Sequence, residues 1–126
     1  MSFRTDRQRV EGLGTAHDGV HHFWLQRVTA LALVPLAILF VLPFAYNLGG
    51  DFEDMRAAYA HPINAIIAIL FFGVMFRHLQ LGLQVVIEDY VPGKAMRLTC
   101  LFLNIGFCWL FGLAAVFAIA RIAFTA

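Results

Sequence analysis

Charged residues are scarce in this 126-residue chain, where Asp, Glu, Lys and Arg supply 13% of the residues against 61% hydrophobic and 14% aromatic. A soluble domain is typically about a quarter charged and slightly under half apolar. Small domains bury only about two-thirds of the surface of their unfolded chain, so a water-soluble fold could not hide this much apolar surface. The composition therefore excludes an aqueous globule and a disordered tail, and it indicates a protein dissolved mainly in lipid.

An excess of charge of one sign is also missing, since nine Lys and Arg stand against eight Asp and Glu. The chain thus lacks the electrostatic footprint of a nucleic-acid-binding protein. Cysteine is nearly absent, with only Cys100 and Cys108. On a helix these two lie about 12 Å apart along the axis, whereas a disulfide needs Cα atoms within about 7 Å. We expect two free thiols that behave as small buried hydrophobes.

The first twenty or so residues contain no apolar run, which is unlike a cleavable signal peptide. They include acidic residues, which are unusual in mitochondrial transit peptides. We therefore expect a multi-pass protein of a bacterial inner membrane.

Three long stretches are almost free of charge. Val28–Gly50 and Leu98–Ala120 contain no Asp, Glu, Lys or Arg, and Pro62–Ile87 contains only Arg77 and His78 as ionisable groups. Each exceeds the roughly 20 residues that a helix needs to cross about 30 Å of hydrocarbon. Backbone groups in lipid must be paired internally, so these stretches must be helical. The prediction is a single all-α membrane domain over residues 1–126, with transmembrane helices at about 23–48, 62–90 and 96–122.

The connections between the spans are short. An acidic segment, Asn47–Asp54, ends the first span, and Met55–Ala60 is expected to form a brief interfacial turn before Pro62. Val91–Lys94 is expected to form the second turn. Pro35 and Pro43 lie inside the first span and should bend it.

Basic residues concentrate on one side of the predicted spans. That side carries Arg4, Arg7, Arg9, Arg27, Lys94 and Arg97. The opposite side has only Arg56 and Arg121. The positive-inside rule then predicts that residues 1–22 form a cytoplasmic N-terminal segment and that the C-terminus lies outside.

Two ionisable residues lie deep in the second span. His78 either forms a hydrogen bond to a neighbouring helix or serves as a proton relay or metal ligand, since intramembrane ionisable residues are costly and mark functional sites. Asp89, eleven residues on, lies within about 20° of the same helical face. Gly82, one turn from His78, allows close approach of either a partner helix or a flat ring. Arg77 cannot share the face of His78, so it needs an acidic, carbonyl or propionate partner or must snorkel.

The end of this span carries Asp89 and Tyr90. Tyr90 is either an interfacial anchor or a donor of a hydrogen bond to a carbonyl-bearing ligand at the lipid boundary. Asp89 is either an ordinary loop acid or the partner of an arginine that fixes the local geometry.

The spacing of His78, Gly82, Asp89 and Tyr90 in the second of three spans resembles the smaller hydrophobic membrane anchor of succinate dehydrogenases (respiratory complex II). A second match is Gly19–Phe23 followed by Arg27-Val-Thr-Ala at the start of span one. The resemblance covers nearly the whole chain. It implies a non-catalytic anchor of succinate:ubiquinone oxidoreductase in electron transport, with no succinate-oxidising site of its own.

The resemblance also implies roles for individual residues. His78 corresponds to an axial ligand of haem b, so it would bind the haem iron. Tyr90 and Asp89 correspond to ubiquinone-binding residues. Arg27 corresponds to an arginine near the haem propionates, and His21 is a weaker candidate for the same vicinity.

The same resemblance implies partners within a larger complex. The second axial histidine would come from a companion membrane anchor of the cytochrome b556 type. An iron–sulfur protein and a flavoprotein of the same complex would dock on the cytoplasmic face, and membrane lipids would surround the spans. Two alternatives stay open at this stage: the anchor of a quinol:fumarate reductase, and a non-redox three-helix membrane accessory protein.

Overall fold

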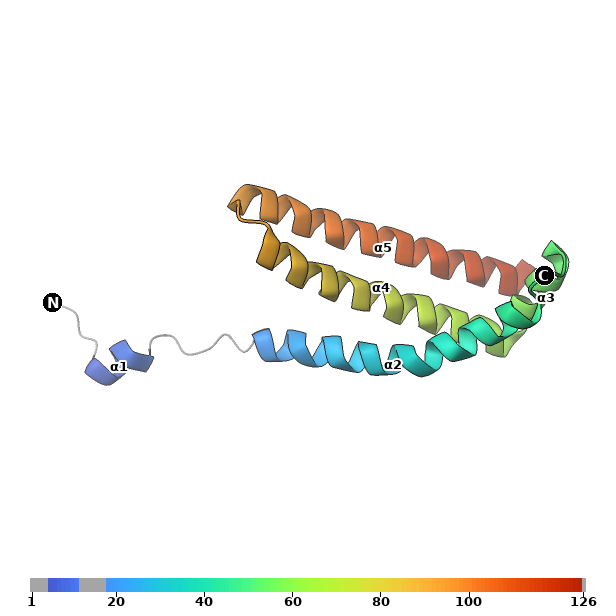
Figure 1. Ribbon diagram of the computed structural model, residues 1–126, viewed down its shortest axis with the longest axis horizontal. Helices are drawn as coiled ribbons and strands as arrows, with labels where there is room; N and C mark the ends of the chain where they lie inside the picture. Colours follow the sequence, from blue (N-terminus) through green and yellow to red (C-terminus); the bar gives the residue numbers. More distant parts are fainter. Residues whose placement is uncertain (1–4, 12–17, 126) are drawn as a thin grey trace.

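The structure is a computed structural model that describes residues 5–11 and 18–125, and over these residues it is helical with no strand. The helices are α1 (Asp6–Glu11), α2 (Asp18–Tyr46), α3 (Phe52–Ala60), α4 (Pro62–Tyr90) and α5 (Lys94–Thr125). Figure 1 shows α4 between α2 and α5, with α3 across one end of the three. Helix α4 packs against both long neighbours, whereas α2 and α5 do not contact each other. The three long helices therefore form a single layer.

Helices α2, α4 and α5 are each long and apolar enough to cross a membrane. This confirms the predicted all-α fold with three membrane-spanning helices. The bounds of α4 match the predicted 62–90, while α2 ends two residues before the predicted 48 and α5 extends beyond 96–122 at both ends. Which side of the membrane holds each terminus stays a prediction.

Helix α2 continues through Pro35 and Pro43, and Figure 1 shows its C-terminal part bending towards α3. Each proline lacks a backbone N–H and its ring displaces the preceding turn, which bends a helix. Beyond α2 the chain turns at Gly49, whose φ of 97° lies in the left-handed region that favours glycine.

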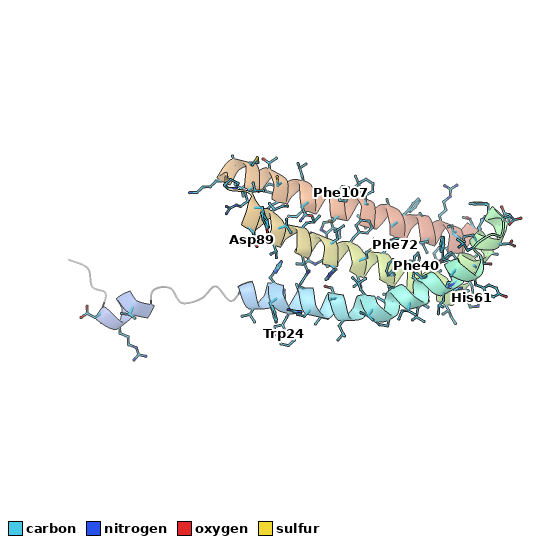
Figure 2. All side chains as sticks on the ribbon, viewed as in Figure 1. Trp24, Phe40, His61, Phe72, Asp89 and Phe107 are labelled. Carbon is cyan, nitrogen blue, oxygen red and sulfur yellow. The ribbon has the colours of Figure 1, made fainter. Side chains whose placement is uncertain are left out.

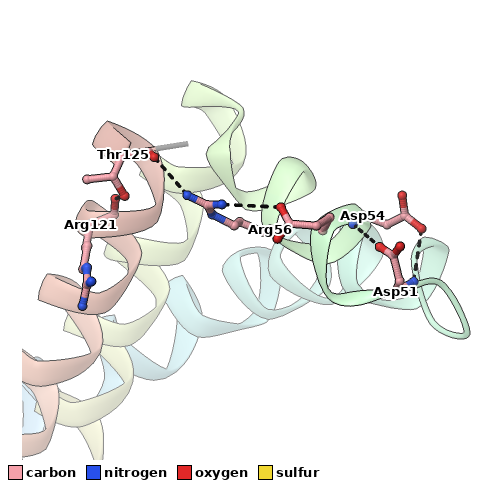
Figure 3. Close-up of polar contacts among 6 residues, drawn as sticks. Asp51, Asp54, Arg56, Arg121 and Thr125 are labelled. Carbon is pink, nitrogen blue, oxygen red and sulfur yellow. Dashed lines mark hydrogen bonds and ion pairs between the residues drawn. The ribbon is translucent and has the colours of Figure 1, made fainter.

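The segment before Pro62 differs from the prediction. Residues 55–60, expected to form a brief turn, belong to the nine-residue helix α3. Asp51 caps this helix by accepting a 2.9 Å hydrogen bond from the backbone N of Asp54, whose own carboxylate accepts from the backbone N of Asp51 at 3.2 Å (Figure 3). This reciprocal capping box satisfies two N–H groups that would otherwise lack partners, and it nucleates a helix in a short segment.

Aromatic rings join α2, α3 and α4 near the α3 end. Phe40 stacks on Phe71 with ring centroids 4.6 Å apart and meets Phe72 edge-on at 5.3 Å; the labels of Phe40 and Phe72 adjoin in Figure 2. Tyr59 of α3 packs on Phe40 and donates a 2.8 Å hydrogen bond to its carbonyl oxygen. Burial raises the pKa of the Tyr59 hydroxyl, because the phenolate would be poorly solvated there.

Polar side chains join α4 to α5 at mid-length. Gln80 and Asn104 are 8% and 6% exposed, and Asn104 Nδ2 donates a 2.9 Å hydrogen bond to the Gln80 carbonyl oxygen. Arg77 donates at 2.9 Å to the side-chain oxygen of Gln80, which supplies the carbonyl partner expected for this arginine. The Cys108 thiol lies 3.5 Å from Asn104 Oδ1. In lipid, such bonds help hold helices together because the alternative is an unpaired polar group.

Few side chains are buried in the described chain. The buried apolar residues are Tyr59, Ala65, Ala68, Leu81 and Cys108. Small residues such as Ala65 and Ala68 let helices approach closely, while most large apolar side chains on α2, α4 and α5 face outward. Both cysteines are free thiols, as predicted, although only Cys108 is buried and Cys100 is half-buried. The outer surface therefore suits lipid or another apolar protein chain.

We expect Tyr59→Phe to weaken the packing of α3 by about 1 kcal/mol, the typical net value of one hydrogen bond. Because the folded pKa of Tyr59 is raised, its contribution is fully present below pH 10, the ordinary value, and is lost as pH rises through the folded pKa. The measurement is the thermal unfolding midpoint of the detergent-purified protein. Tyr46→Phe is the matched control because Tyr46 is exposed; equal shifts in both variants would contradict the assignment.

Candidate functional site

His78 lies near the middle of α4, is half-buried and faces α2. Its Nδ1 is 2.9 Å from Thr29 Oγ1, which is itself 2.7 Å from the carbonyl oxygen of Leu25. A threonine hydroxyl has a single proton. If that proton goes to the closer Leu25 carbonyl, Thr29 Oγ1 accepts from His78 Nδ1–H. This assignment leaves the lone pair of His78 Nε2 available, and no residue in the described ranges bonds to that atom.

An open groove of about 330 Å³, called here the His78 groove, lies between α2 and α4. Its lining consists of Gly19, His22, Phe23, Gln26, Arg27, Ala30, His78 and Val85. His22 Nε2 and Gln26 Oε1 are buried, yet neither has a hydrogen-bond partner within residues 5–11 and 18–125. Buried polar atoms normally have partners, so each orphan needs an explanation. Two such atoms in one groove indicate a site completed by a group from outside this chain.

Arg27 reaches the same groove from α2. Its guanidinium lies over the ring of Phe23, with Cζ 5.2 Å from the centroid, and the residue is otherwise exposed. The structure therefore brings together Arg27 and His78, two residues that the sequence singled out from different spans. A cation and an imidazole share one apolar-walled groove.

Gly82 faces α2 in this region. A Cβ built on it would lie 3.4 Å from Gln26 Nε2, which is ordinary contact distance. The glycine thus serves as a point of close helix approach, one of the two roles considered for it. His78, Gly82 and Val85 all turn towards α2, in agreement with the predicted face of α4.

The two adjacent histidines of α2 separate. His22 lines the His78 groove, whereas His21 is exposed and lines a second groove between the same helices that excludes His78. That groove, of about 420 Å³, also contains His22, Arg77, Gln84 and Glu88. A role for His21 near a prosthetic group stays a prediction.

Asp89 and Tyr90 end α4 and lie apart from the His78 groove. Tyr90 is 79% exposed and Asp89 is exposed, without a hydrogen-bond partner in the described part of the chain. Figure 2 shows Asp89 at the α5-facing end of α4 and His61 at the opposite end. Twelve residues separate His78 from Tyr90, about 18 Å along the helix axis. The structure therefore holds two separate candidate positions, one within the layer and one at its edge.

Sequence reasoning missed His22, Gln26 and Thr29 as site residues. These polar residues recur at intervals of four and three along α2, which places them on one helical face. That spacing is a usable signal, because a polar stripe at the start of an apolar span needs polar partners in lipid. Across the described residues, no cluster of three or more His, Cys, Asp or Glu side chains could hold a metal ion.

Known proteins resemble this chain over most of its length. A family model described as succinate dehydrogenase/fumarate reductase transmembrane subunit matches residues 1–120. The succinate dehydrogenase hydrophobic membrane anchor subunit of Paracoccus denitrificans is 36% identical over 121 residues, covering 96% of this chain and 93% of the relative. The protein of the same description from Rickettsia bellii is 37% identical over 98 residues, with 77% and 78% covered. No solved structure matches the chain significantly.

The chain belongs to the family of succinate dehydrogenase and fumarate reductase transmembrane subunits. Together with the three apolar helices, this makes it a membrane anchor subunit of succinate dehydrogenase and a multi-pass protein of the bacterial inner membrane. The resemblance drawn from the His-Gly-Asp-Tyr spacing is thereby confirmed. As an anchor it associates with the other subunits of its complex, which fits the large apolar surface that it leaves exposed.

We expect Gly82→Leu to push α2 away from α4, because its larger side chain would displace Gln26 and widen the gap beside His78. Gly82→Ala should be tolerated, since a Cβ alone meets Gln26 at contact distance. Overpacking of this kind costs about 1–3 kcal/mol. The measurement is the yield of assembled complex and its thermal midpoint; equal losses for both variants would argue against a graded steric effect.

Proposed function

We propose that this anchor contributes one axial ligand of a haem b through His78 and part of a ubiquinone-reduction site through Tyr90 and Asp89. The observation that carries the first half is the hydrogen bond between His78 and Thr29. Metal-binding histidines commonly donate their other ring N–H to an oxygen, which fixes the ring and raises its basicity. Thr29 supplies that oxygen at 2.9 Å and leaves His78 Nε2 for the iron.

The residues of the His78 groove suit a haem. The orphaned His22 Nε2 and Gln26 Oε1 are polar groups that await a partner. Arg27 would offset the negative charge of haem propionates, and Gly82 keeps bulk away from α4 beside His78. A bound haem would supply a one-electron carrier within the membrane, with a potential set by its ligands and surroundings.

A single histidine from this chain leaves the other axial position to a different chain of the complex. The companion anchor of the cytochrome b556 type would supply that second histidine and cover the open side of the His78 groove. This arrangement accounts for a groove with a ligand and a cation on its walls but one side exposed. His21 stays a weaker candidate for the propionate vicinity because it lines the neighbouring groove.

The quinone half of the proposal concerns the edge of the layer. A quinone is an apolar molecule with two carbonyls, so it should enter from lipid and meet polar donors at the boundary. Tyr90 presents an exposed phenol at the end of α4, where it would donate to a quinone carbonyl. Asp89 has an open carboxylate beside it, which would hold a partner arginine in place.

Reduction of the quinone requires two electrons and two protons. With the N-terminus in the cytoplasm, as the positive-inside rule predicts, Tyr90 and Asp89 face the cytoplasm and its water. The iron–sulfur protein and the flavoprotein of the complex would dock on this face and carry succinate oxidation. The anchor would thus take part in electron transfer from succinate to ubiquinone without a succinate-oxidising site of its own.

His78→Ala should abolish the low-spin b-type haem signal in the reduced-minus-oxidised spectrum of the purified complex, because one axial ligand is lost. Thr29→Val should retain the haem but raise its midpoint potential, since an imidazole without its Nδ1–H acceptor donates less charge to iron. The two measurements are the spectrum and a redox titration. An unchanged spectrum in His78→Ala would remove His78 from the ligand set, and an unchanged potential in Thr29→Val would remove the positioning role.

Tyr90→Phe should lower quinone reduction by about tenfold to a hundredfold, consistent with loss of one hydrogen bond to the reacting group. Succinate oxidation by a soluble artificial dye should persist, because that reaction bypasses the anchor. The comparison is made on one purified preparation, with Tyr46→Phe as the control at the opposite end of the layer. Equal loss of both activities would show failed assembly rather than a quinone-site defect.

A further inference from the structure

We infer that α3 and α5 together bind the phosphate of an anionic phospholipid, at the membrane surface opposite Tyr90. The two helices form an open groove of about 430 Å³. Its lining combines apolar side chains with two arginines: Phe52, Arg56, Phe117, Ala118, Arg121, Ile122 and Thr125. Neither the haem nor the quinone proposal uses these residues.

Arg56 is held in place by both helices. Its Nη2 donates a 2.9 Å hydrogen bond to the carbonyl oxygen of Thr125, and its Nη1 lies 3.4 Å from Glu53 Oε2 (Figure 3). The side chain is 32% exposed, so part of the guanidinium still faces the groove. The contact with Thr125 fixes this arginine relative to the end of α5, and the cost of ordering its side chain is met before any lipid binds.

Arg121 offers the second cation. Its guanidinium has no hydrogen bond or ion pair with any residue from 18 to 125 or from 5 to 11, and Figure 3 shows it turned away from Thr125. An arginine on the lipid-facing surface of a spanning helix needs a partner, because an isolated charge near hydrocarbon is costly. Phosphate oxygens match the planar fork of arginine donors.

The length of α5 places Arg121 at the depth of lipid phosphates. Lys94 and Arg121 are 27 residues apart on this continuous helix, which is about 40 Å at 1.5 Å per residue. The hydrocarbon core is about 30 Å thick, and about 40–45 Å with the headgroup layers. A helix carrying these two cations is therefore accommodated best with Lys94 in one headgroup layer and Arg121 in the other.

The apolar wall selects a lipid over a free anion. Phe117 and Ile122 line the groove on the α5 side, beside Arg121. Phe52 lines it from α3 and is largely exposed. A phosphate held by the arginines would leave its acyl chains against these side chains, so affinity would come from charge and apolar contact together. Free phosphate would gain only the first.

Nearby carboxylates set the limit on affinity. Glu53 already takes part of the charge of Arg56. Asp51 and Asp54 are engaged in the capping box at the start of α3, and Figure 3 shows them on the side of Arg56 away from Arg121. Glu53 is thus the intramolecular competitor for a lipid phosphate, and its removal should strengthen lipid binding.

The test uses the complete, delipidated complex in detergent, titrated with dioleoylphosphatidylglycerol and followed by native mass spectrometry. Arg121→Gln should raise the apparent Kd of its tightest phosphatidylglycerol site about fivefold to tenfold, the loss expected for one partly screened charge-assisted hydrogen bond. Glu53→Gln should lower that Kd. Lys94→Gln, which removes the same charge at the other end of α5, should leave it unchanged.

Two further titrations separate the sources of the effect. Dioleoylphosphatidylcholine should bind more weakly than phosphatidylglycerol and should not distinguish the Arg121→Gln complex from the parent. Excess sodium phosphate should not displace phosphatidylglycerol. Equal responses of Arg121→Gln and Lys94→Gln, equal affinity for the two lipids, or displacement by phosphate would each overturn the proposal. If Arg121→Gln fails to assemble, unchanged binding in Glu53→Gln overturns it as well.

Discussion

The hydrogen bond between Thr29 and His78 joins the first and second spans at the position on which the proposed redox role depends. In hydrocarbon, an imidazole without a partner would be costly, and Thr29 meets that requirement at 2.9 Å from Nδ1. Because the threonine hydroxyl also lies 2.7 Å from the Leu25 carbonyl, its one proton is best placed there. The same interaction thus stabilises the contact of α2 with α4 and leaves Nε2 of the histidine available.

The anchor is built as part of a larger assembly. Its three long helices form one layer in which α2 and α5 never meet, and most large apolar side chains remain on the surface. The His78 groove has the same character, since it holds an imidazole, a guanidinium and two orphaned polar atoms on an open side. A layer of this kind suits a protein that completes its binding sites only with a neighbouring chain.

The sequence was sufficient for the spans because hydropathy and charge report directly on the lipid environment. The second span, with Pro62 at its start and the turn at Val91, was located to the residue. Helix α3 was underestimated as a turn because its reciprocal Asp51–Asp54 capping was overlooked. The choice between His21 and His22 could not be made from the sequence, since neighbouring residues differ by about 100° around a helix and the rotation of α2 decides which one meets α4.

Side-chain partners across helices were equally hard to predict. The face of α4 that carries His78 and Gly82 follows from helical periodicity, whereas its contact with Thr29 and Gln26 depends on the register between two spans. The most direct test of the account is near-infrared magnetic circular dichroism of the oxidised wild-type complex, because this spectrum identifies the axial ligands of a low-spin haem. The account predicts the signature of two neutral histidines. A signature of histidine with methionine, or of a high-spin haem with one protein ligand, would contradict it.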